Sequence, residues 1–488
     1  MEAETVDQGG APGGVDALTK GQILLAAGID LQRAGRAEEA IEAYGRAISA
    51  RPDLVEAYHN LGVALRGSGR TAASVACFRR SLRLRPGHAA TLSNLGNALR
   101  SMGEVDDAVE LLRQAAAGEP ASPEIAYNLA LALRDAGALA EAIRYFDHSI
   151  ELRPDRHHVR IERGLAHLLA GNYPAGFADL LLRHPAPVVP VRGKSWARWT
   201  GASLDGRHVL VRAGDDLAET ALFARFVPLA ATRGVPVILE GPDDAIPLLE
   251  TVEGAARVVR RGGRFANVAA EVPLADLPRI LGVTLDTLPA ATPYMRVPRT
   301  PRRELPPAAP GRVRIGIAWA TAAADGEAYK PGCMLTQFLR LAEHPDIDLF
   351  ALQAGASADI AAAGAGALVQ ELEGIEDPTV LAAGIAAMDL VVGVDGPAVH
   401  LAGALGHPVW VVLPPAPAWY WSIGRDDSPW YPTAWLFRQR KAGDWAAVLR
   451  RVRASLDRAL DAPTDETPDQ TQAAAEAAAR AADTGPGA

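Results

Sequence analysis

The sequence predicts an α-helical repeat solenoid followed by an α/β region with two lobes. Three observations carry this prediction. Residues from about 20 to 184 repeat a pattern every 34 residues. Residues 388–414 contain two runs of strand formers separated by a short helical segment, which is typical of a parallel βαβ unit. A Pro-rich stretch at 297–311 divides the region after the repeats in two.

Composition limits the classes of protein that this chain can be. Its 488 residues are too many for one core, and an apolar fraction of 49% indicates that most of them fold. The net charge of −9 argues against nucleic acid and anionic membranes as partners. Cys77 and Cys333 lie far apart with no metal spacing, and neither a signal peptide nor a membrane span is predicted. We therefore expect a cytoplasmic protein without a metal site.

The repeat is defined by small residues, turn glycines and closing prolines. The small position, where two helices must approach closely, holds Gly28, Gly62, Gly96, Ala130 and Gly164. The turn between the helices holds Gly35, Gly69, Gly103, Gly137 and Gly171, and units close with Pro52, Pro86, Pro120 and Pro154. These features resemble the tetratricopeptide repeat, a helix–turn–helix unit that stacks into a solenoid. We expect a solenoid over 19–190, with four clear repeats and a degenerate fifth, after a disordered tail at 1–18.

Asparagine recurs at one position of the repeat, as Asn60, Asn94 and Asn128. A solenoid of this type has a concave face that holds an extended peptide. The three amides are therefore candidates for contacts with the backbone of a protein or peptide partner. The alternative is a structural hydrogen bond between successive repeats, and the sequence alone does not separate the two.

The remainder of the chain divides at prolines. Residues 184–194 cannot continue a helix, so a first α/β lobe is expected over 191–300. A Pro-rich linker follows at 301–311, and a second lobe over 312–460. Beyond residue 461 the chain lacks apolar pattern and is predicted to be a disordered tail. In the first lobe, residues 217–233 are predicted to form one helix.

The second lobe contains the candidate anion site. Strands are expected at 390–394 and 409–413, with a helix between them that Asp395 caps and Pro397 begins. The N–H groups at such a helix start, at the carboxyl end of a strand, bind anions such as a diphosphate. His400, one turn into the helix, would face the same crevice or pack as a core histidine.

Both lobes resemble a known enzyme family. D-L-V-V-G-V-D-G-P-A-V-H-L-A-G-A-L-G-H-P-V-W at 389–410 and R-D-D-S-P-W-Y-P-T-A-W-L-F-R-Q at 425–439 are similar to motifs of bacterial tetratricopeptide-repeat glycosyltransferases of GT-B fold. T-A-L-F-A-R-F at 220–226 matches their first lobe. The catalytic halves of that family are similar to heptosyltransferases and, more distantly, to O-GlcNAc transferases.

The resemblance implies two Rossmann-like lobes and metal-independent transfer of a sugar from a nucleotide donor to an acceptor hydroxyl. By position, it makes the donor-binding candidates Lys330, Asp395, Gly396, Pro397 and His400. An aromatic cluster around Trp419 would stack the nucleobase or simply pack the lobe. No cofactor beyond the nucleotide-sugar substrate is implied, and the acceptor is expected to be Ser or Thr of a protein held by the repeats. Flagellin-like proteins are one acceptor class that the resemblance allows.

Three departures from the family's motifs bear on catalysis. Ala218 and Glu219 replace the glycine and aspartate of the family's G-E-Q-G-L-G-D turn, which leaves Glu219 as the candidate general base. Residues 320–334 lack the expected histidine and paired arginines, and Gly396 replaces a threonine. Two hypotheses result. The chain is an active glycosyltransferase, or it is a degenerate one that acts as a peptide-binding scaffold through its repeats.

Overall fold

The computed structural model describes residues 13–181, 196–263, 266–299, 310–319 and 333–461. Most of the two predicted tails, most of the linker and Lys330 lie outside these ranges. The chain forms two compact units, residues 1–162 and 163–488, and each is described by itself. Among the described helices, none combines the length and the apolar character that crossing a membrane requires.

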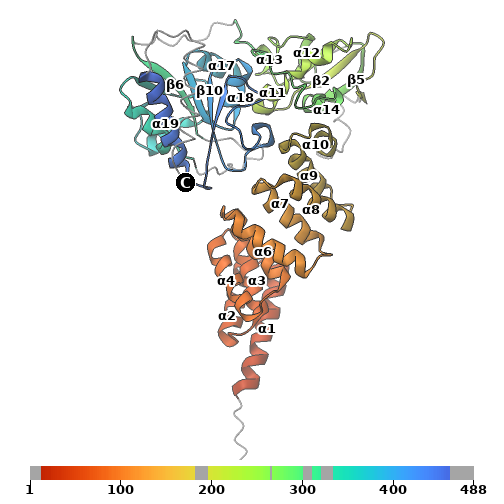
Figure 1. Ribbon diagram of the computed structural model, residues 1–488, viewed down its shortest axis with the longest axis vertical. Coiled ribbons are helices and arrows are strands. Elements are labelled where there is room, and N and C mark those ends of the chain that lie inside the picture. The colour runs from red at the N-terminus through yellow and green to blue at the C-terminus, as the bar shows by residue number, and fades with distance from the viewer. Residues whose placement is uncertain (1–12, 182–195, 264–265, 300–309, 320–332, 462–488) are drawn as a thin grey trace, which may run out of the picture. The chain divides into compact units, whose positions relative to one another are not determined.

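The first unit consists of paired antiparallel helices (Figure 1). The pairs are α1 (Gly13–Arg33) with α2 (Ala37–Ala50), α3 (Val55–Gly67) with α4 (Thr71–Leu84), α5 (Ala89–Ser101) with α6 (Val105–Gly118), and α7 (Pro123–Asp135) with α8 (Leu139–Leu152). The fifth pair, α9 (His157–Leu169) and α10 (Tyr173–Leu180), begins in the first unit and ends in the second. Helix α1 begins inside the stretch predicted as a tail.

Glycines explain why each pair closes tightly. A Cβ added to Gly62 would lie 2.6 Å from Cε1 of Phe78, and one added to Gly96 would lie 2.7 Å from Cγ of Leu112. The turn glycines Gly69 and Gly103 have φ values of +76° and +82°, a conformation that other residues rarely adopt. The predicted small and turn positions are thereby confirmed. Small residues therefore recur every 34 residues because two helices approach closely at the same point of each repeat.

The second unit contains two parallel sheets with helices packed against them (Figure 1). The first has the order β1-β5-β2-β3-β4. Its elements are β1 (Ala197–Arg198), β2 (His208–Arg212), α11 (Leu217–Phe223), α12 (Phe226–Ala231), β3 (Val237–Gly241), α13 (Ile246–Leu249), β4 (Ala255–Arg260), β5 (Val268–Pro273) and α14 (Leu277–Ile280).

The single helix predicted over 217–233 is wrong, because the structure has two. The chain breaks between α11 and α12, at Ala224 and Arg225. The break places Pro228 in the first turn of α12, where its missing N–H removes no intrahelical bond. It also turns the Arg225 side chain into the interior, where 3% of the residue is exposed.

The second sheet has the order β11-β10-β9-β6-β7-β8. Its elements are β6 (Val313–Ala318), α15 (Leu335–Phe338), β7 (Ile347–Ala351), α16 (Ala356–Ala362), β8 (Val369–Glu371), α17 (Pro378–Ala386), β9 (Leu390–Val394), α18 (Pro397–Ala404), β10 (Val409–Leu413), β11 (Ala434–Arg438) and α19 (Trp445–Asp461). Numbered along the chain, this is the doubly wound order 3-2-1-4-5-6, in which ligands bind at the carboxyl ends of the strands, where the order reverses. That switch point lies between β6 and β9.

Alternation along the strands divides the core of this sheet between its two faces. Val392 and Val394 belong to one buried cluster with Val448 and Val452 of α19. Gly393 faces the other way, because a Cβ there would lie 3.0 Å from Val399 of α18. The strands predicted at 390–394 and 409–413 are confirmed. Each is buried along its whole length, as expected of a parallel strand covered on both sides.

Candidate functional site

The start of α18 lies at the switch point of the second sheet. Gly396 is its N-cap residue, and Pro397 begins the helix. The prediction that Asp395 caps this helix is wrong, since α18 has no side-chain cap. Gly396 has an extended backbone (φ 170°) and carries no side chain that could occupy the N–H groups of the first turn. N–H groups at a helix start are suited to an anion, and the N-cap residue of α18 supplies no side chain to them. A diphosphate at this position stays a prediction.

Asp395 and His400 form a hydrogen-bonded polar pair beside this helix start. Nε2–H of His400 donates to Oδ1 of Asp395 over 2.9 Å, and the Tyr420 hydroxyl donates to Oδ2 over 2.9 Å. Nδ1 of His400 lies 2.8 Å from the Tyr431 hydroxyl, and its ring stacks on Trp421 with centroids 5.3 Å apart. His400 is 1% exposed, and both of its nitrogens have partners within the chain. The ring therefore holds the Asp395 carboxylate in place, and direct contact with a diphosphate stays a prediction.

Arg225 joins the two lobes next to this pair. Its guanidinium donates to the carbonyls of Pro289 and Trp430 and to the hydroxyl of Tyr294. It also lies over three aromatic rings, with Cζ 4.6–5.1 Å from the centroids of Tyr294, Tyr431 and Trp430. Among the residues that the structure describes, no carboxylate forms an ion pair with it. Carbonyl oxygens and ring faces compensate its buried charge instead.

A run of tyrosines connects Glu219's helix with the start of α18. The Tyr294 hydroxyl donates to the carbonyl of Ala221, two residues after Glu219, and the Arg225 guanidinium lies over the rings of both Tyr294 and Tyr431. Tyr431 in turn contacts His400. Burial raises the pKa of Tyr294 and of Tyr431 above their ordinary value, so both hydroxyls stay protonated. Tyr294 thus contacts α11, and Tyr431 contacts His400 of α18.

Glu219 itself lies in the first turn of α11, at the carboxyl end of β2. Asp216 caps this helix, and its carboxylate accepts from the N–H of Ala218 and of Glu219. The Glu219 side chain is exposed. Helix α11 packs against α18, so this exposed carboxylate lies on a helix that borders the start of the second lobe's candidate helix. Its role as a general base stays a prediction.

Trp419 lies at a junction within the second unit. Its ring packs edge-on against Tyr173 and Phe177 of α10, with centroids 5.8 and 5.6 Å apart, and against Trp430 at 5.2 Å. It is 8% exposed. These contacts match the packing alternative, and a base stacked on Trp419 stays a prediction.

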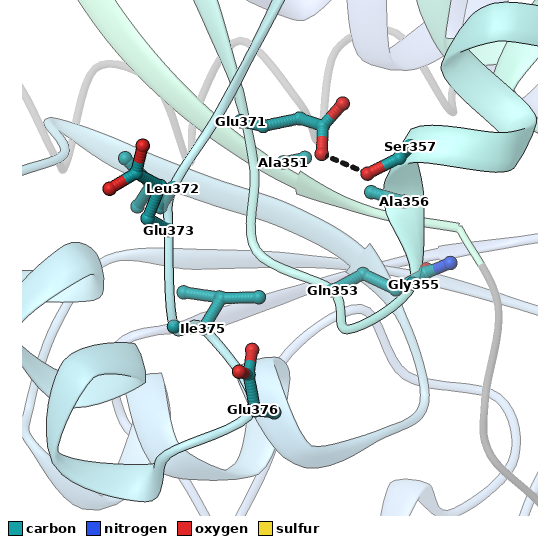
Figure 2. A pocket seen from close by; sticks show the side chains of 11 residues that line it. Ala351, Gln353, Gly355, Ala356, Ser357, Glu371, Leu372, Glu373, Ile375 and Glu376 are labelled. Carbon is teal, nitrogen blue, oxygen red and sulfur yellow. Dashed lines mark hydrogen bonds between the residues drawn. The ribbon is translucent and has the colours of Figure 1, made fainter.

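A cavity of about 280 Å³ lies at the carboxyl ends of β7 and β8, on the same edge of the sheet as α18's first turn (Figure 2). Gln353 and Ser357 line it together with the carboxylates of Glu371, Glu373 and Glu376. The Ser357 hydroxyl donates to Glu371 over 2.5 Å. Strand β7 is two strands from β9, or about 10 Å. Acceptor-rich walls suit hydroxyl and N–H groups, whereas they repel phosphate.

Lys330 cannot be placed, because it lies outside the described residues. No cluster of His, Cys, Asp or Glu within the described ranges has the arrangement of a metal site. The sequence predicts no role for Tyr294 or Arg225, although Arg225 lies within the motif at 220–226. Tyr420 and Tyr431 are expected only as members of the aromatic cluster around Trp419. What Arg225, Tyr294 and Tyr431 share is a large side chain with a polar group that is buried where the two lobes meet. This feature appears only when the partner segments are brought together.

The asparagine series makes contacts between repeats. Nδ2 of Asn128 donates to the Ser93 hydroxyl over 3.0 Å, and Arg66 donates to Oδ1 of Asn94 over 3.4 Å. All three asparagines are partly exposed on the first helices of their repeats. The alternative of structural inter-repeat bonds therefore applies to Asn94 and Asn128. Each amide retains hydrogen-bonding capacity, so contact with a partner stays a prediction.

Comparison with known proteins identifies the repeats. Family models described as tetratricopeptide repeat match residues 93–157 and 53–118, and a model described as TPR repeat matches 33–69. Among solved structures, MamA from Desulfovibrio magneticus RS-1 is 21% identical with a TM-score of 0.32, covering 33% of this chain and 92% of that one. YrrB, described as a TPR protein with an unusual peptide-binding site, is 18% identical with a TM-score of 0.30, covering 33% and 82%.

One curated relative extends beyond the repeats. Protein FlbA of Caulobacter vibrioides is 24% identical over 386 residues, which cover 64% of this chain and 63% of the relative. The chain thus spans less than two thirds of that relative's length. The repeat helices occupy residues 13–180, about a third of the chain, so part of the alignment lies in the α/β region. The N-terminal half of this chain carries tetratricopeptide repeats, and a region with two parallel sheets follows them.

Proposed function

We propose that the α/β region transfers a sugar from a nucleotide-sugar donor to a hydroxyl of a protein that the repeats recruit. The observation that carries the proposal is the uncapped start of α18 at the switch point of a sheet with the order 3-2-1-4-5-6. A helix terminus in that position is suited to a diphosphate.

Charge decides which way the donor lies. The diphosphate meets the N–H groups after Gly396, and the nucleoside extends toward the cavity of Gln353 and Glu371, where ribose hydroxyls and base N–H groups find acceptors. Asp395 is fixed by His400 and Tyr420, and its side chain is 28% exposed. Its carboxylate accepts a hydrogen bond from a hydroxyl group of the donor. Without those two hydrogen bonds the carboxylate would be free to turn toward the phosphates and repel them.

Glu219 supplies the base. Its carboxylate takes the proton from the acceptor hydroxyl while that oxygen bonds to the anomeric carbon of the sugar. The bond between this carbon and the diphosphate oxygen breaks, and the nucleoside diphosphate leaves. The developing negative charge on the leaving oxygen is stabilised by the N–H groups of α18.

The test measures binding and transfer separately. Calorimetry of the full chain with uridine, cytidine, guanosine and adenosine diphosphates should give saturable binding for one base. In Gly396→Asp the new carboxylate should cap α18, as Asp216 caps α11 and Asp377 caps α17, and should compete with the diphosphate. We expect at least tenfold weaker nucleotide binding with the fold retained.

Glu219→Gln separates the base from the donor site. It should bind nucleotide as the wild type does and lose labelled-sugar transfer to protein by at least a hundredfold. Asp215→Asn, an exposed carboxylate of the same loop that pairs with Arg261, is the matched control and should keep transfer. If no nucleotide or nucleotide sugar binds the wild-type chain, the transferase proposal fails and the scaffold hypothesis stands.

A further inference from the structure

Three arginines recur at the same position of successive repeats, 34 residues apart. Arg66, Arg100 and Arg134 occupy the last turns of α3, α5 and α7. These first helices of the repeats are neighbours in the unit. The three side chains are partly exposed. They lie on the face of the solenoid that is formed by the first helices of the repeats, α3, α5 and α7, which we call the first-helix face.

The charge on these arginines is compensated to different degrees. Arg134 pairs with two carboxylates, Asp135 and Glu162. Arg100 pairs with one, donating to Asp135 over 2.7 Å, and its Nε is buried without a partner. Among the residues that the structure describes, Arg66 has only Oδ1 of Asn94, at 3.4 Å, and no carboxylate.

The repeat explains the missing acids. Glu162 follows Arg134 by 28 residues, and Asn94 follows Arg66 by the same 28. Asp135 follows Arg100 by 35 residues, and the residue at that distance from Arg66 is Ser101. Both acidic positions are therefore neutral at Arg66. The last repeats show, within the same molecule, how a carboxylate fits this site.

Electrostatics agree with this comparison. Burial lowers the pKa of Arg66 below its ordinary value, and the neighbouring Arg100 guanidinium lowers it further. Burial acts on Arg134 in the same direction, but Asp135 and Glu162 outweigh it and raise the pKa of Arg134. The positive charge at Arg66 is thus partly desolvated and faces a like charge. The negative charge of a bound carboxylate would compensate the desolvated guanidinium and offset its repulsion by Arg100.

We infer that the first-helix face binds an extended peptide segment of a partner protein through an Asp or Glu side chain seated on Arg66 between α3 and α5. Asn60 and Asn94 lie on the same helices and supply amide contacts to the peptide backbone. We assign the bound carboxylate to a side chain because, within this chain, the equivalent Arg134 pairs with the side chain of Glu162. This inference rests on the proposed recruitment of a protein by the repeats and names the chemistry of that partner.

The experiment selects peptides from a random library on the full wild-type chain and measures their affinities by fluorescence anisotropy. An acidic residue should be enriched at one fixed position of the selected peptides. Arg66→Gln should weaken their binding at least tenfold, and replacing the peptide's acid by its amide should have the same effect. Arg113→Gln, which removes an exposed arginine paired with Glu141, is the matched control and should leave binding unchanged.

A second variant keeps the test independent of folding defects. Asn94→Glu gives Arg66 the internal partner that Glu162 gives Arg134, so it should block the acidic peptides without lowering the melting temperature. The inference is overturned if the selected peptides carry no acid at a fixed position, if they bind through a free C-terminal carboxylate, or if both variants bind as the wild type does. Nucleotide binding should be unchanged in both, so this failure is distinct from failure of the transferase proposal.

Discussion

Arg225 donates a hydrogen bond of 2.8 Å to the hydroxyl of Tyr294, and its guanidinium also lies over the ring of that tyrosine, with Cζ 4.6 Å from the centroid. Tyr294 belongs to the segment after the first sheet, and its N–H donates to the carbonyl of Ala404 in α18. The pair therefore connects the break between α11 and α12 with the helix that carries the candidate anion site.

Replacing Arg225 should loosen the contact between the lobes. Arg225→Met leaves the buried carbonyl of Trp430 and the partly buried carbonyl of Pro289 without their donor, at a cost of about 3 kcal/mol. Arg225→Lys should cost less than Arg225→Met, because an ammonium keeps the positive charge and can still donate. Some cost remains, because the ammonium lacks the planar fork of the guanidinium. Thermal unfolding measures both. Arg233→Met, which removes an exposed arginine bonded to a single carbonyl, should change stability by no more than about 0.5 kcal/mol.

The hydrogen bond between Trp430 and Tyr173 should hold α10 on the α/β region. Nε1–H of Trp430 donates to the Tyr173 hydroxyl over 2.8 Å, and Tyr173 is 1% exposed. Tyr173→Phe leaves a buried indole N–H without an acceptor, so we expect a loss of about 1–3 kcal/mol in denaturant unfolding. Tyr145→Phe, on α8, is the comparison and should be close to neutral. Equal stability of the two variants would contradict a role for this bond.

Two glycines of α3 should respond oppositely to alanine. A Cβ at Gly62 would lie 2.6 Å from the fully buried Phe78 ring, so Gly62→Ala should destabilise the repeats by about 1–3 kcal/mol. Gly67 has no atom within 4 Å of the added Cβ, and Gly67→Ala should stabilise by about 0.5 kcal/mol. Circular dichroism during thermal unfolding gives both signs. A stabilising Gly62→Ala would show that the two helices can separate at no cost.

The two cysteines should differ in reactivity. Burial raises the pKa of Cys333 to about 12, so about one thiol in ten thousand is ionised at pH 8. Cys77 is partly exposed, and burial raises its pKa also. A thiol reagent should label one cysteine in the native chain and two after denaturation, and Cys77→Ser should abolish the native reaction. Rapid labelling of Cys333 in the folded chain would be the contrary result.

The same thiol should lower the stability of the folded chain at high pH. In the unfolded chain Cys333 loses its proton near its ordinary pKa of 9.0, whereas in the folded chain it keeps it to about 12. Its contribution to folding is therefore fully present below pH 9 and falls as the pH rises toward 12. Unfolding in urea across this range, compared with Cys333→Ala, isolates the effect.

Local patterns in the sequence determined much of this protein. Small residues, turn glycines and prolines spaced 34 residues apart fixed the repeats, because each unit packs mainly against its neighbours. The strands on both sides of Asp395 and the start of α18 at Pro397 followed from runs of strand formers and from the restricted backbone of proline. These features depend on residues close together in the chain.

Only the tertiary structure decided what the polar residues contact. Asp395 has the residue type of a helix cap, yet it accepts from His400 and from Tyr420, which lies 25 residues away. The sequence around Pro228 is compatible with one continuous helix, yet the helix breaks at Ala224 and Arg225, where the Arg225 side chain packs against the second lobe. The missing carboxylate at Arg66 appears only when three repeats are compared in space. Such contacts join distant segments, and their energies depend on burial, which no local pattern records.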